Sequence, residues 1–416
     1  MNIVMPFKQG ITEAKRKAIF AEGLDPVLIG ISVALLCIGL VMVASASITV
    51  ADRNIASPFY YLQRQGIATG IGFIACMFML KVRLVYWEKS GMVLLAFAFF
   101  LLVLVLVPGI GKTVNGSTRW LPIGVLNLQV SELVKLFLLI YVAGYLVRHG
   151  EAVRSSLLGF IKPMIMIGIA CVLLLLEPDF GASAVIMLTA LGMMFLGGVH
   201  FFQFISFIAM FALTAALLII SSPYRMQRLT TFINPWADPF DSGFQLTQSL
   251  IAIGSGSWTG TGLGGSVQKL FYLPEAHTDF VFAVMAEELG FIGVIVVIAL
   301  FGALFIRAFM IARKAEMGGN QFSAYLAYGI GIWLGLQAFI NIGVNMGVLP
   351  TKGLTLPLMS YGGSSLIVTC AAIGLLLRIH YECNAAQAMV RNTRKSPKPG
   401  MKSKNSTMRE MFEDAA

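Results

Sequence analysis

Charged side chains are scarce in this chain of 416 residues, and their scarcity excludes the most common class of protein. They make up 12% of the sequence, where a soluble domain carries about 25%. Apolar residues make up 57%, so much of the surface cannot face water, and an ordinary soluble globular fold is excluded. The net charge of +10 would indicate a nucleic-acid partner in a soluble protein. The positions of the basic residues therefore matter more than their sum.

Cysteine and histidine are also few and widely separated. The four histidines, at positions 149, 200, 277 and 380, lack the spacing of a metal site. Four of the five cysteines lie inside apolar runs, which favours packing over a disulfide framework or a thiolate metal site. The cysteines are Cys37, Cys76, Cys171, Cys370 and Cys383. We therefore predict no metal centre built from these residues.

Three further patterns are missing. The alternating ten-residue pattern of membrane β-barrels is not found. The glycine-rich string SGSWTGTGLGG at 255–265 lacks the preceding strand and the GK[ST] ending of a P-loop, so it does not predict a nucleotide site. The first apolar run is too long for a cleavable signal peptide and lacks a small-residue cleavage site. We expect it to remain as a signal anchor.

Long apolar runs dominate the chain instead. A helix needs roughly 20 apolar residues to cross a bilayer core of about 30 Å. We therefore predict an all-α polytopic integral membrane protein with about ten transmembrane helices. The runs lie near 26–47, 62–80, 91–108, 130–147, 161–177, 181–198, 202–221, 280–304, 324–346 and 359–379. The divisions after Phe180 and at 197–202 could be drawn differently.

The basic residues predict how these helices are oriented. With the N-terminus in the cytoplasm, 21 of the 30 Lys and Arg residues fall on the cytoplasmic side, as the positive-inside rule requires. The segment 1–25 and the basic tail 386–416 are then both cytoplasmic. Pro and Ser between the basic residues of the tail are typical of a disordered segment attracted to anionic lipid. Nucleic acid is a poor second interpretation, and we expect no nucleic-acid partner.

One connection is much longer than the others. Residues 222–279 leave the membrane on the extracytoplasmic side in this orientation, and they hold a string of glycines, four prolines and two tryptophans. A loop of this length is usually functional or disordered. Its many aromatic residues argue against simple disorder.

Ionisable residues in or beside the predicted helices are costly, on the order of 3 kcal/mol at the middle of the bilayer, and are functional candidates by default. Most of them lie near the outer leaflet, and a cavity that opens outward is the simplest way to gather them. The candidates are Glu132, Lys135, Glu177, Asp179, Asp279, Glu287, Glu288 and Lys352.

Asp279 follows Thr278, a plausible N-cap, at the predicted start of a helix. The helix dipole would hold an acidic side chain there in its charged form, ready to accept a proton. Plain helix capping explains the same residues and is the more common case. Helix geometry places Glu287 closer than Glu288 to the face of Asp279. His277 we interpret as mostly structural.

The remaining candidates each keep two interpretations. Glu132 and Lys135 are three residues apart and can pair on a helix surface, either to neutralise each other or to take part in catalysis. Lys352 could bind a phosphate or a carboxylate, or be a solvated loop lysine. Arg119 and Trp120 could stack or bind an anion, or anchor the chain at the membrane interface.

Several segments, in order along residues 26–385, resemble a known family. They are Gly-Ser-Thr-Arg-Trp at 116–120, Gln129–Lys135, Glu177–Gly181, Asn234–Pro239, Gly243–Ser249, Pro274–Phe280, Leu349–Pro357 and Ser360–Ser365. The chain resembles the SEDS family (shape, elongation, division and sporulation), and within it the cell-division members of Gram-negative bacteria. Residues 1–25 and those after about 385 lie outside the resemblance.

The resemblance implies an activity and a set of site residues. It implies a transmembrane glycosyltransferase domain over 26–385 that polymerises lipid II into peptidoglycan strands at the division septum, facing the periplasm from the inner membrane. The implied partners are a class B penicillin-binding protein acting as transpeptidase and other division-site membrane proteins. The family's essential aspartate corresponds to Asp279. Other positions of functional importance correspond to Trp120, Glu132, Gln245, Gln248, Ser249 and Lys352.

The chemistry of lipid II gives these residues testable roles. The donor sugar is α-linked to a diphosphate and the product bond is β-1,4, so the reaction inverts the anomeric carbon and one base suffices. We expect Asp279 to accept the proton of the acceptor's 4-hydroxyl. Lys352, Arg119 or a divalent cation (Mg or Mn) could offset the charge of the leaving diphosphate; no cofactor is certain. A lipid II flippase and a scaffold that recruits a transpeptidase are the alternatives.

Overall fold

The helices of the structure coincide with the apolar runs of the sequence. The computed structural model describes residues 23–395 apart from 115, 124–125, 242 and 352. Ten helices match the ten predicted runs, and none of the runs forms a strand. They are α2 (Pro26–Ile55), α3 (Tyr60–Lys81), α4 (Leu84–Leu106), α5 (Val130–Ser155), α6 (Leu157–Leu176), α7 (Phe180–Leu196), α8 (Phe201–Ile220), α11 (Val281–Met317), α12 (Gln321–Asn345) and α13 (Gly363–Lys395).

Within the described residues, eight of these helices are long and apolar enough to cross a membrane, all except α3 and α7. The all-α polytopic membrane fold is thereby confirmed, while the exact number of spans stays a prediction. The basic tail predicted at 386–416 begins inside α13, which continues to Lys395. The residues from 396 onward and the segment 1–22 lie outside the described residues.

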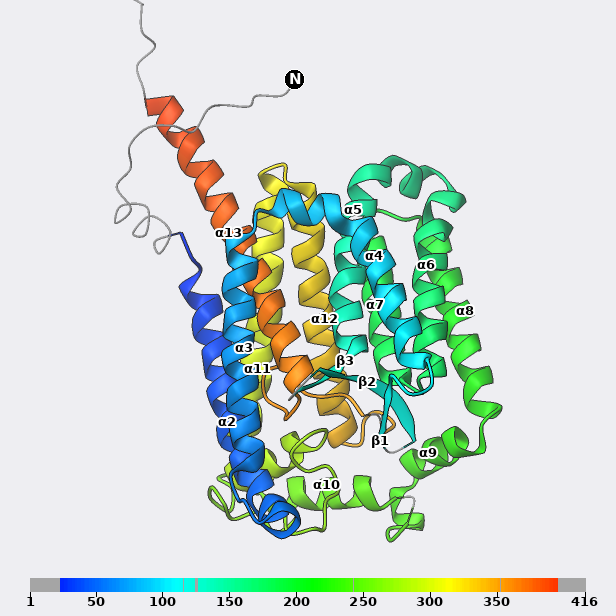
Figure 1. Cartoon of the computed structure of the whole chain (residues 1–416), viewed down its shortest axis with the longest axis vertical. Helices are drawn as coiled ribbons and strands as arrows, with labels where there is room; N and C mark the ends of the chain where they lie inside the picture. Colours follow the sequence, from blue (N-terminus) through cyan, green and yellow to red (C-terminus); the bar gives the residue numbers. More distant parts are fainter. Residues whose placement is uncertain (1–22, 115, 124–125, 242, 352, 396–416) are drawn as a thin grey trace, which may run out of the picture.

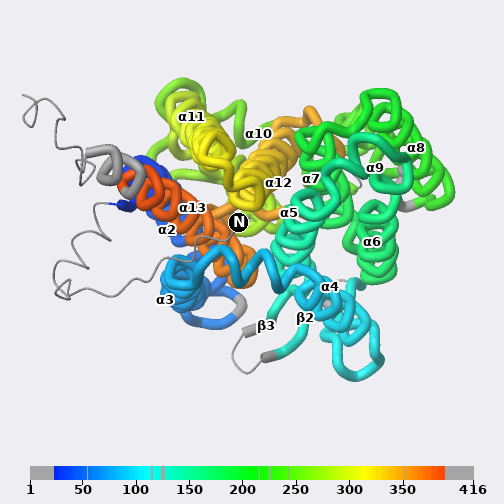
Figure 2. Tube along the Cα trace, turned by 90° about the horizontal axis from the view of Figure 1, so that it is seen from above, coloured from blue at the N-terminus to red at the C-terminus, as the bar shows by residue number. Residues whose placement is uncertain are grey.

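The helices form one bundle with α5 and α12 near its middle and α8 at its edge (Figure 2). The apolar window of α5 is 83% buried within the protein, whereas that of α8 is 0% buried. Leu, Ile and Phe side chains of α8 are therefore exposed and available to lipid. The buried α5 is the helix on which the sequence places Glu132 and Lys135.

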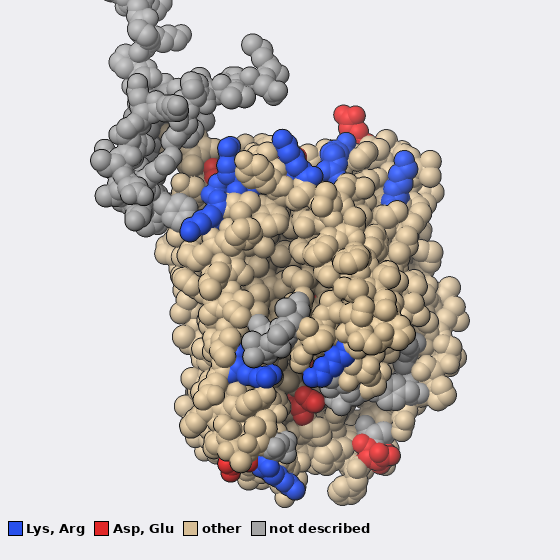
Figure 3. All heavy atoms as spheres, in the orientation of Figure 1, with Lys and Arg blue, Asp and Glu red and all other residues tan. Residues whose placement is uncertain are grey.

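The two ends of the bundle differ in charge and in structure. Lys and Arg side chains gather at the upper end of the molecule (Figure 3), which is also the end where α2 begins and α13 ends (Figure 1). This is the end that the positive-inside rule predicts to be cytoplasmic. The lower end carries α9 (Pro223–Ile233), α10 (Phe244–Ser255) and a small sheet (Figure 1).

The small sheet was not predicted from the sequence. Its antiparallel strands β1 (Lys112–Val114), β2 (Ser117–Ile123) and β3 (Leu126–Gln129) lie in the order β1-β2-β3 between α4 and α5. In β2 and β3, Trp120 pairs with Gln129. The strands are too short to appear as a periodic pattern, and they fix the position of the Arg119 and Trp120 side chains.

The long connection between α8 and α11 is largely structured, as its aromatic content predicts. It holds α9, the short 3-10 helix η1 (Pro235–Ala237), α10 and a series of turns. Its glycines permit close packing against α11: a Cβ on Gly256 would lie 2.0 Å from the carbonyl oxygen of Ala286, and one on Gly260 2.1 Å from that of Glu288. These glycines therefore serve backbone packing.

Glu287 and Glu288 of α11 hold this connection in place. The Glu287 carboxylate accepts hydrogen bonds from the Ser266 hydroxyl at 2.5 Å and from the Val267 N–H at 2.9 Å. The Glu288 carboxylate pairs with the Lys269 ammonium at 2.8 Å. The acidic pair that the sequence offered as functional candidates thus anchors the glycine-rich segment on α11.

Candidate active site

Asp279 lies in the turn that leads into α11, and α12 holds it there. The side-chain amides of Asn341 and Asn345 donate hydrogen bonds of 2.9 and 3.0 Å to the main-chain carbonyl of Asp279. The Asn345 side-chain oxygen also accepts the Ala283 N–H at 3.2 Å. Two amides on one helix therefore fix the backbone from which the Asp279 carboxyl projects.

The predicted cap of this helix is wrong. α11 begins at Val281 with Phe280 as its N-cap residue, and that residue makes no side-chain capping bond. The Thr278 hydroxyl instead donates to the Glu275 carboxylate at 2.7 Å. The first turn is satisfied from a neighbouring helix, because Asn345 supplies the acceptor that a local Thr would have supplied. Asp279 is consequently outside the first helical turn.

The expectation that a helix terminus keeps Asp279 fully ionised is also wrong. Burial above all, and then the charges of Glu275 and Asp179, raise the pKa of Asp279 to about 7 against the opposing effect of Arg119 and Arg228. Near neutral pH the carboxyl therefore exists in both protonation states. This range suits a general base, since it can hold and release a proton at the operating pH.

The segment after α12 lies directly against Asp279. A Cβ on Gly353 would be 3.1 Å from the Asp279 Oδ2 atom. Arg228 of α9 donates to the carbonyl of Thr351 at 3.3 Å, which ties the long connection to the same segment. Lys352, the predicted anion ligand, lies outside the described residues, between two neighbours whose positions border the site.

Arg119 and Trp120 approach the site from β2. The Arg119 guanidinium lies 5.8 Å from the centre of the Trp120 ring, and its Nη2 donates to the Ser117 hydroxyl at 2.8 Å. Its Nη1 lies 3.8 Å from Asp179 Oδ1. The cation–π contact agrees with the stacking interpretation of the Arg-Trp pair, and the guanidinium also faces an acidic group.

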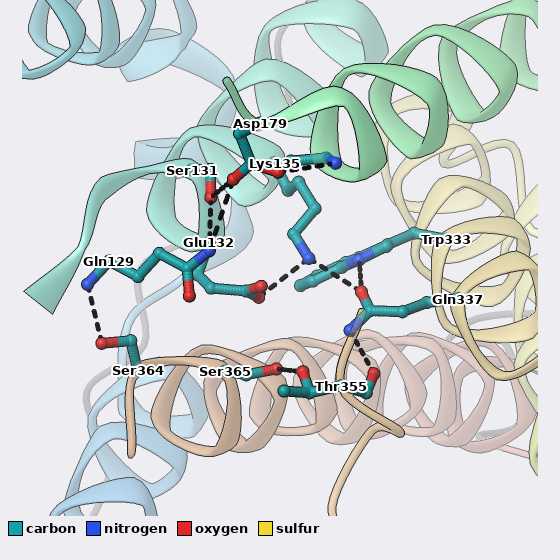
Figure 4. A network of polar contacts seen from close by, with 11 residues as sticks. Gln129, Ser131, Glu132, Lys135, Asp179, Trp333, Gln337, Thr355, Ser364 and Ser365 are labelled. Atoms are coloured by element: carbon teal, nitrogen blue, oxygen red, sulfur yellow. Dashed lines mark hydrogen bonds and ion pairs between the residues drawn. The ribbon is translucent and has the colours of Figure 1, made fainter. Parts of the chain in front are cut away.

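Asp179 is the N-cap residue of α7 and gathers several donors. It accepts the Ser131 hydroxyl at 2.9 Å and the Gln129 side-chain amide at 3.3 Å (Figure 4). It also accepts the Ala182 N–H at 3.2 Å. These bonds satisfy the N-terminus of α7 and join it to the start of α5. Asp179 is thus a helix cap that also contacts Arg119.

Glu132 and Lys135 form a buried ion pair with a nitrogen–oxygen distance of 2.8 Å (Figure 4). The Lys135 ammonium also donates to the Gln337 side-chain oxygen at 2.8 Å, which accepts the Trp333 indole N–H as well. The Gln337 amide in turn donates to the Thr355 carbonyl at 2.9 Å. The pair neutralises two intramembrane charges, as one of the two interpretations requires, and it links α5 to α12 and to the segment after α12.

The α10 residues reach the site through Ser249. Its hydroxyl donates to the Asn345 carbonyl at 2.8 Å, so α10 is bound to the helix that holds Asp279. Gln245 and Gln248 on the same helix are half-buried. His277 packs its ring 4.6 Å from that of Tyr61, and its position among tyrosine rings agrees with a structural role.

Asn341, Asn345 and Gln337 are site residues that the sequence analysis missed. They are spaced four residues apart on α12, so they share one helical face. Three amides at this spacing in an otherwise apolar helix were the signal that could have found them. Among the described residues, no three His, Cys, Asp or Glu side chains come together as a metal site.

Comparison with known proteins shows what the chain is similar to. The family model for cell cycle proteins of the FtsW, RodA and SpoVE type matches residues 26–385. A probable peptidoglycan glycosyltransferase FtsW from Thioalkalivibrio sulfidiphilus is 60% identical over 362 residues, which cover 87% of this chain and 90% of the relative. The protein of the same description from Legionella pneumophila is 53% identical, over 86% of this chain and 91% of the relative.

Two solved structures have the same arrangement of helices. A chain from a peptidoglycan synthase complex, studied for its coordination of polymerization and crosslinking, superposes with a TM-score of 0.72 at 31% identity, covering 86% of this chain and 98% of the other. The rod shape determining protein RodA of Thermus thermophilus superposes with a TM-score of 0.63 at 29% identity, over 86% of this chain and 96% of its own.

Proposed function

Because this chain belongs to the family of FtsW, RodA and SpoVE cell cycle proteins, we infer that it is a peptidoglycan glycosyltransferase of cell division. The chain spans nearly the whole length of relatives that carry this activity in their description and are 50 to 60% identical. Its apolar helices make it a multi-pass membrane protein. We further propose that the bilayer is the inner membrane at the septum, with Asp279 facing the periplasm.

We propose that the substrate is lipid II, and that Asp279 is the general base. The acceptor's 4-hydroxyl oxygen forms the new bond to the donor's anomeric carbon as the bond from that carbon to the diphosphate breaks. The hydroxyl proton passes to the Asp279 carboxylate, and the lipid diphosphate leaves with the bonding electrons. The observation that carries this proposal is the Asp279 carboxyl, with a pKa of about 7 and a backbone held by Asn341 and Asn345.

Cationic groups near Asp279 suit the departing diphosphate. Arg119 and Arg228 both act electrostatically on Asp279, and Lys352 follows Thr351 in the segment that borders it. Fixed positive charges near the developing negative charge of a transition state lower its free energy. We propose these three residues as the diphosphate ligands. We propose Trp120, Glu132, Gln245, Gln248 and Ser249 as supporting substrate contacts.

A penicillin-binding protein of class B is the proposed partner. A structural relative comes from a complex that coordinates polymerization with crosslinking, and crosslinking is the reaction of a transpeptidase. A polymerase that releases strands next to a transpeptidase would supply its substrate directly. We expect the two proteins to co-purify from the membrane.

The function is tested with purified protein and lipid II. Glycan strands formed in detergent support the glycosyltransferase, whereas movement of lipid II across liposomes without strand formation would support a flippase. Asp279→Ala distinguishes a scaffold, because a scaffold tolerates this change as long as its complex assembles. Asp241→Asn is the matched control, since Asp241 is an exposed carboxylate in the same connection.

A further inference from the structure

Glu177 is a buried acid that the proposed reaction does not use. It is the C-cap residue that follows α6, and its exposure is 0%. Among the described residues, neither of its carboxyl oxygens has a hydrogen-bond partner. A buried carboxylate without donors is strongly disfavoured, so the neutral acid is the stable form.

The charges around Glu177 favour the same form. Burial above all, and then the charge of the neighbouring Asp179, raise the pKa of Glu177 to about 8 against the opposing effect of Arg119. Asp179 and Glu177 lie in the same connection between α6 and α7, and Arg119 approaches this connection from β2. The start of α5 contributes the uncharged side chains of Ser131 and Gln129, which bond to Asp179. Glu177 therefore carries its proton at neutral pH.

Arg119 has donor capacity that nothing in its surroundings uses. Its buried Nε has no acceptor among the described residues. The contact of its Nη1 with Asp179, at 3.8 Å, is longer than a hydrogen bond. The side chain keeps 22% of its surface exposed, so the guanidinium can still reach a ligand.

The Asp179 carboxylate does not need Arg119 as a hydrogen-bond donor. The Ala182 N–H, the Ser131 hydroxyl and the Gln129 amide already donate to its two oxygens. The Glu177 carboxyl therefore has no donor among the described residues, and the Arg119 Nε has no acceptor, although its Nη2 donates to Ser117. Loss of the Glu177 proton favours an ion pair with Arg119, because a buried carboxylate attracts a guanidinium much more strongly than a carboxylic acid does.

We propose that Glu177 is a positioning residue whose proton keeps the Arg119 guanidinium available to the diphosphate of the substrate. Loss of the proton draws Arg119 onto Glu177 and weakens binding of the anionic ligand. The inference rests on the proposed function, since the diphosphate belongs to the proposed substrate. It assigns no contact with the substrate to Glu177 itself.

The test measures the dissociation constant of undecaprenyl diphosphate for the purified full chain between pH 7 and pH 9. In the native protein we expect the constant to rise about tenfold over this range, because one pH unit above the pKa leaves about a tenth of Glu177 protonated. Glu177→Gln keeps the size and neutrality of the acid, so its constant should lack this tenfold rise. Ionisation of the ligand and of Asp279 affects both proteins equally.

A second variant separates positioning from packing. Arg119→Gln should bind weakly at every pH, and adding Glu177→Gln to it should change nothing further. A dissociation constant that is flat in the native protein, or that rises equally in Glu177→Gln, would overturn the inference. Strand formation from lipid II at pH 7 is measured in parallel. If the native protein forms no strands, the proposed function is contradicted. If it forms strands normally but the dissociation constant does not change with pH as expected, only the role of Glu177 is contradicted.

Discussion

The side-chain amide of Asn345 donates a 3.0 Å hydrogen bond to the main-chain carbonyl of Asp279. The two residues are 66 positions apart, and the bond joins the end of α12 to the turn before α11. The neighbouring Asn341 makes the same contact at 2.9 Å. The proposed base is thus positioned through its backbone, and its carboxyl remains available for chemistry.

These amides are expected to matter for turnover. Asn345→Ala or Asn341→Ala alone leaves one donor on the Asp279 carbonyl, so we expect a moderate loss of kcat. The double variant should lose about a hundredfold, the cost of a displacement of about 1 Å at a reacting group. KM for lipid II should change little. Asn320→Ala, at the exposed opposite end of α12, is the control, and equal activity of the double variant and the control would remove the amides from the site.

The pKa of Asp279 predicts a pH profile. A general base works when it is deprotonated, so activity should rise with pH through about 7. We expect kcat/KM at pH 6 to be about a tenth of its value at pH 8. The initial rate of strand formation measures this directly. A rate that is constant from pH 6 to pH 8 would contradict the assigned base.

The buried ion pair of Glu132 and Lys135 predicts a non-additive effect on stability. Lys135→Met leaves an unpaired buried carboxylate and should destabilise the fold by about 3 to 5 kcal/mol. The double variant Glu132→Gln/Lys135→Met should be more stable than Lys135→Met alone, because both charges are gone. Thermal unfolding in detergent checks this order, with Lys162→Met at an exposed position of α6 as the control. A midpoint for Lys135→Met equal to that of the control would argue against the pair.

Lys352 should act through its charge. If it binds the diphosphate, Lys352→Arg keeps most of the activity and Lys352→Ala loses it, since either cation can pair with a phosphate. The two variants and the native protein are compared for KM and kcat with lipid II. Equal activity in all three would place Lys352 outside the site.

The raised pKa of Glu177 predicts that stability falls as the pH rises toward 8. The folded pKa of about 8 lies above the ordinary value of about 4.3 in an unfolded chain. The stabilising contribution is therefore complete below the unfolded pKa and is lost as the pH rises through the folded one. The unfolding midpoint should drop between about pH 5 and pH 8, level off above about pH 9, and drop less in Glu177→Gln. An identical drop in both proteins would show that another group titrates.

The helices were predictable from the sequence because a run of about 20 apolar residues is enough by itself to predict a membrane-crossing helix. Asp279 and the Glu132–Lys135 pair were also predictable, the first from family motifs and the second from a spacing of three residues. The capping of α11 could not be predicted. The acceptor for the Ala283 N–H is the side chain of Asn345, a distant residue, and not that of Thr278. The anchoring of the glycine-rich segment by Glu287 is likewise a tertiary contact that no local pattern encodes.

The small sheet and the interaction of Arg119 with Asp179 were missed for the same reason. The strands are short, and the residues that pair in them do not lie in a sequence that alternates between polar and apolar side chains. Arg119 and Asp179 are separated by two helices along the chain, so their contact depends on how α5 and α6 pack. Local patterns predict elements, whereas the site arises from packing between them.

The most direct test of the account is the rate of glycan strand formation from lipid II by Asp279→Asn, measured beside the native protein and Asp241→Asn. The Asn side chain keeps the shape of Asp279 but cannot accept the hydroxyl proton. We predict that Asp279→Asn folds, binds undecaprenyl diphosphate and forms no strands, while Asp241→Asn is fully active. Strand formation by Asp279→Asn at a rate near that of the native protein would contradict the assignment of Asp279 as the base.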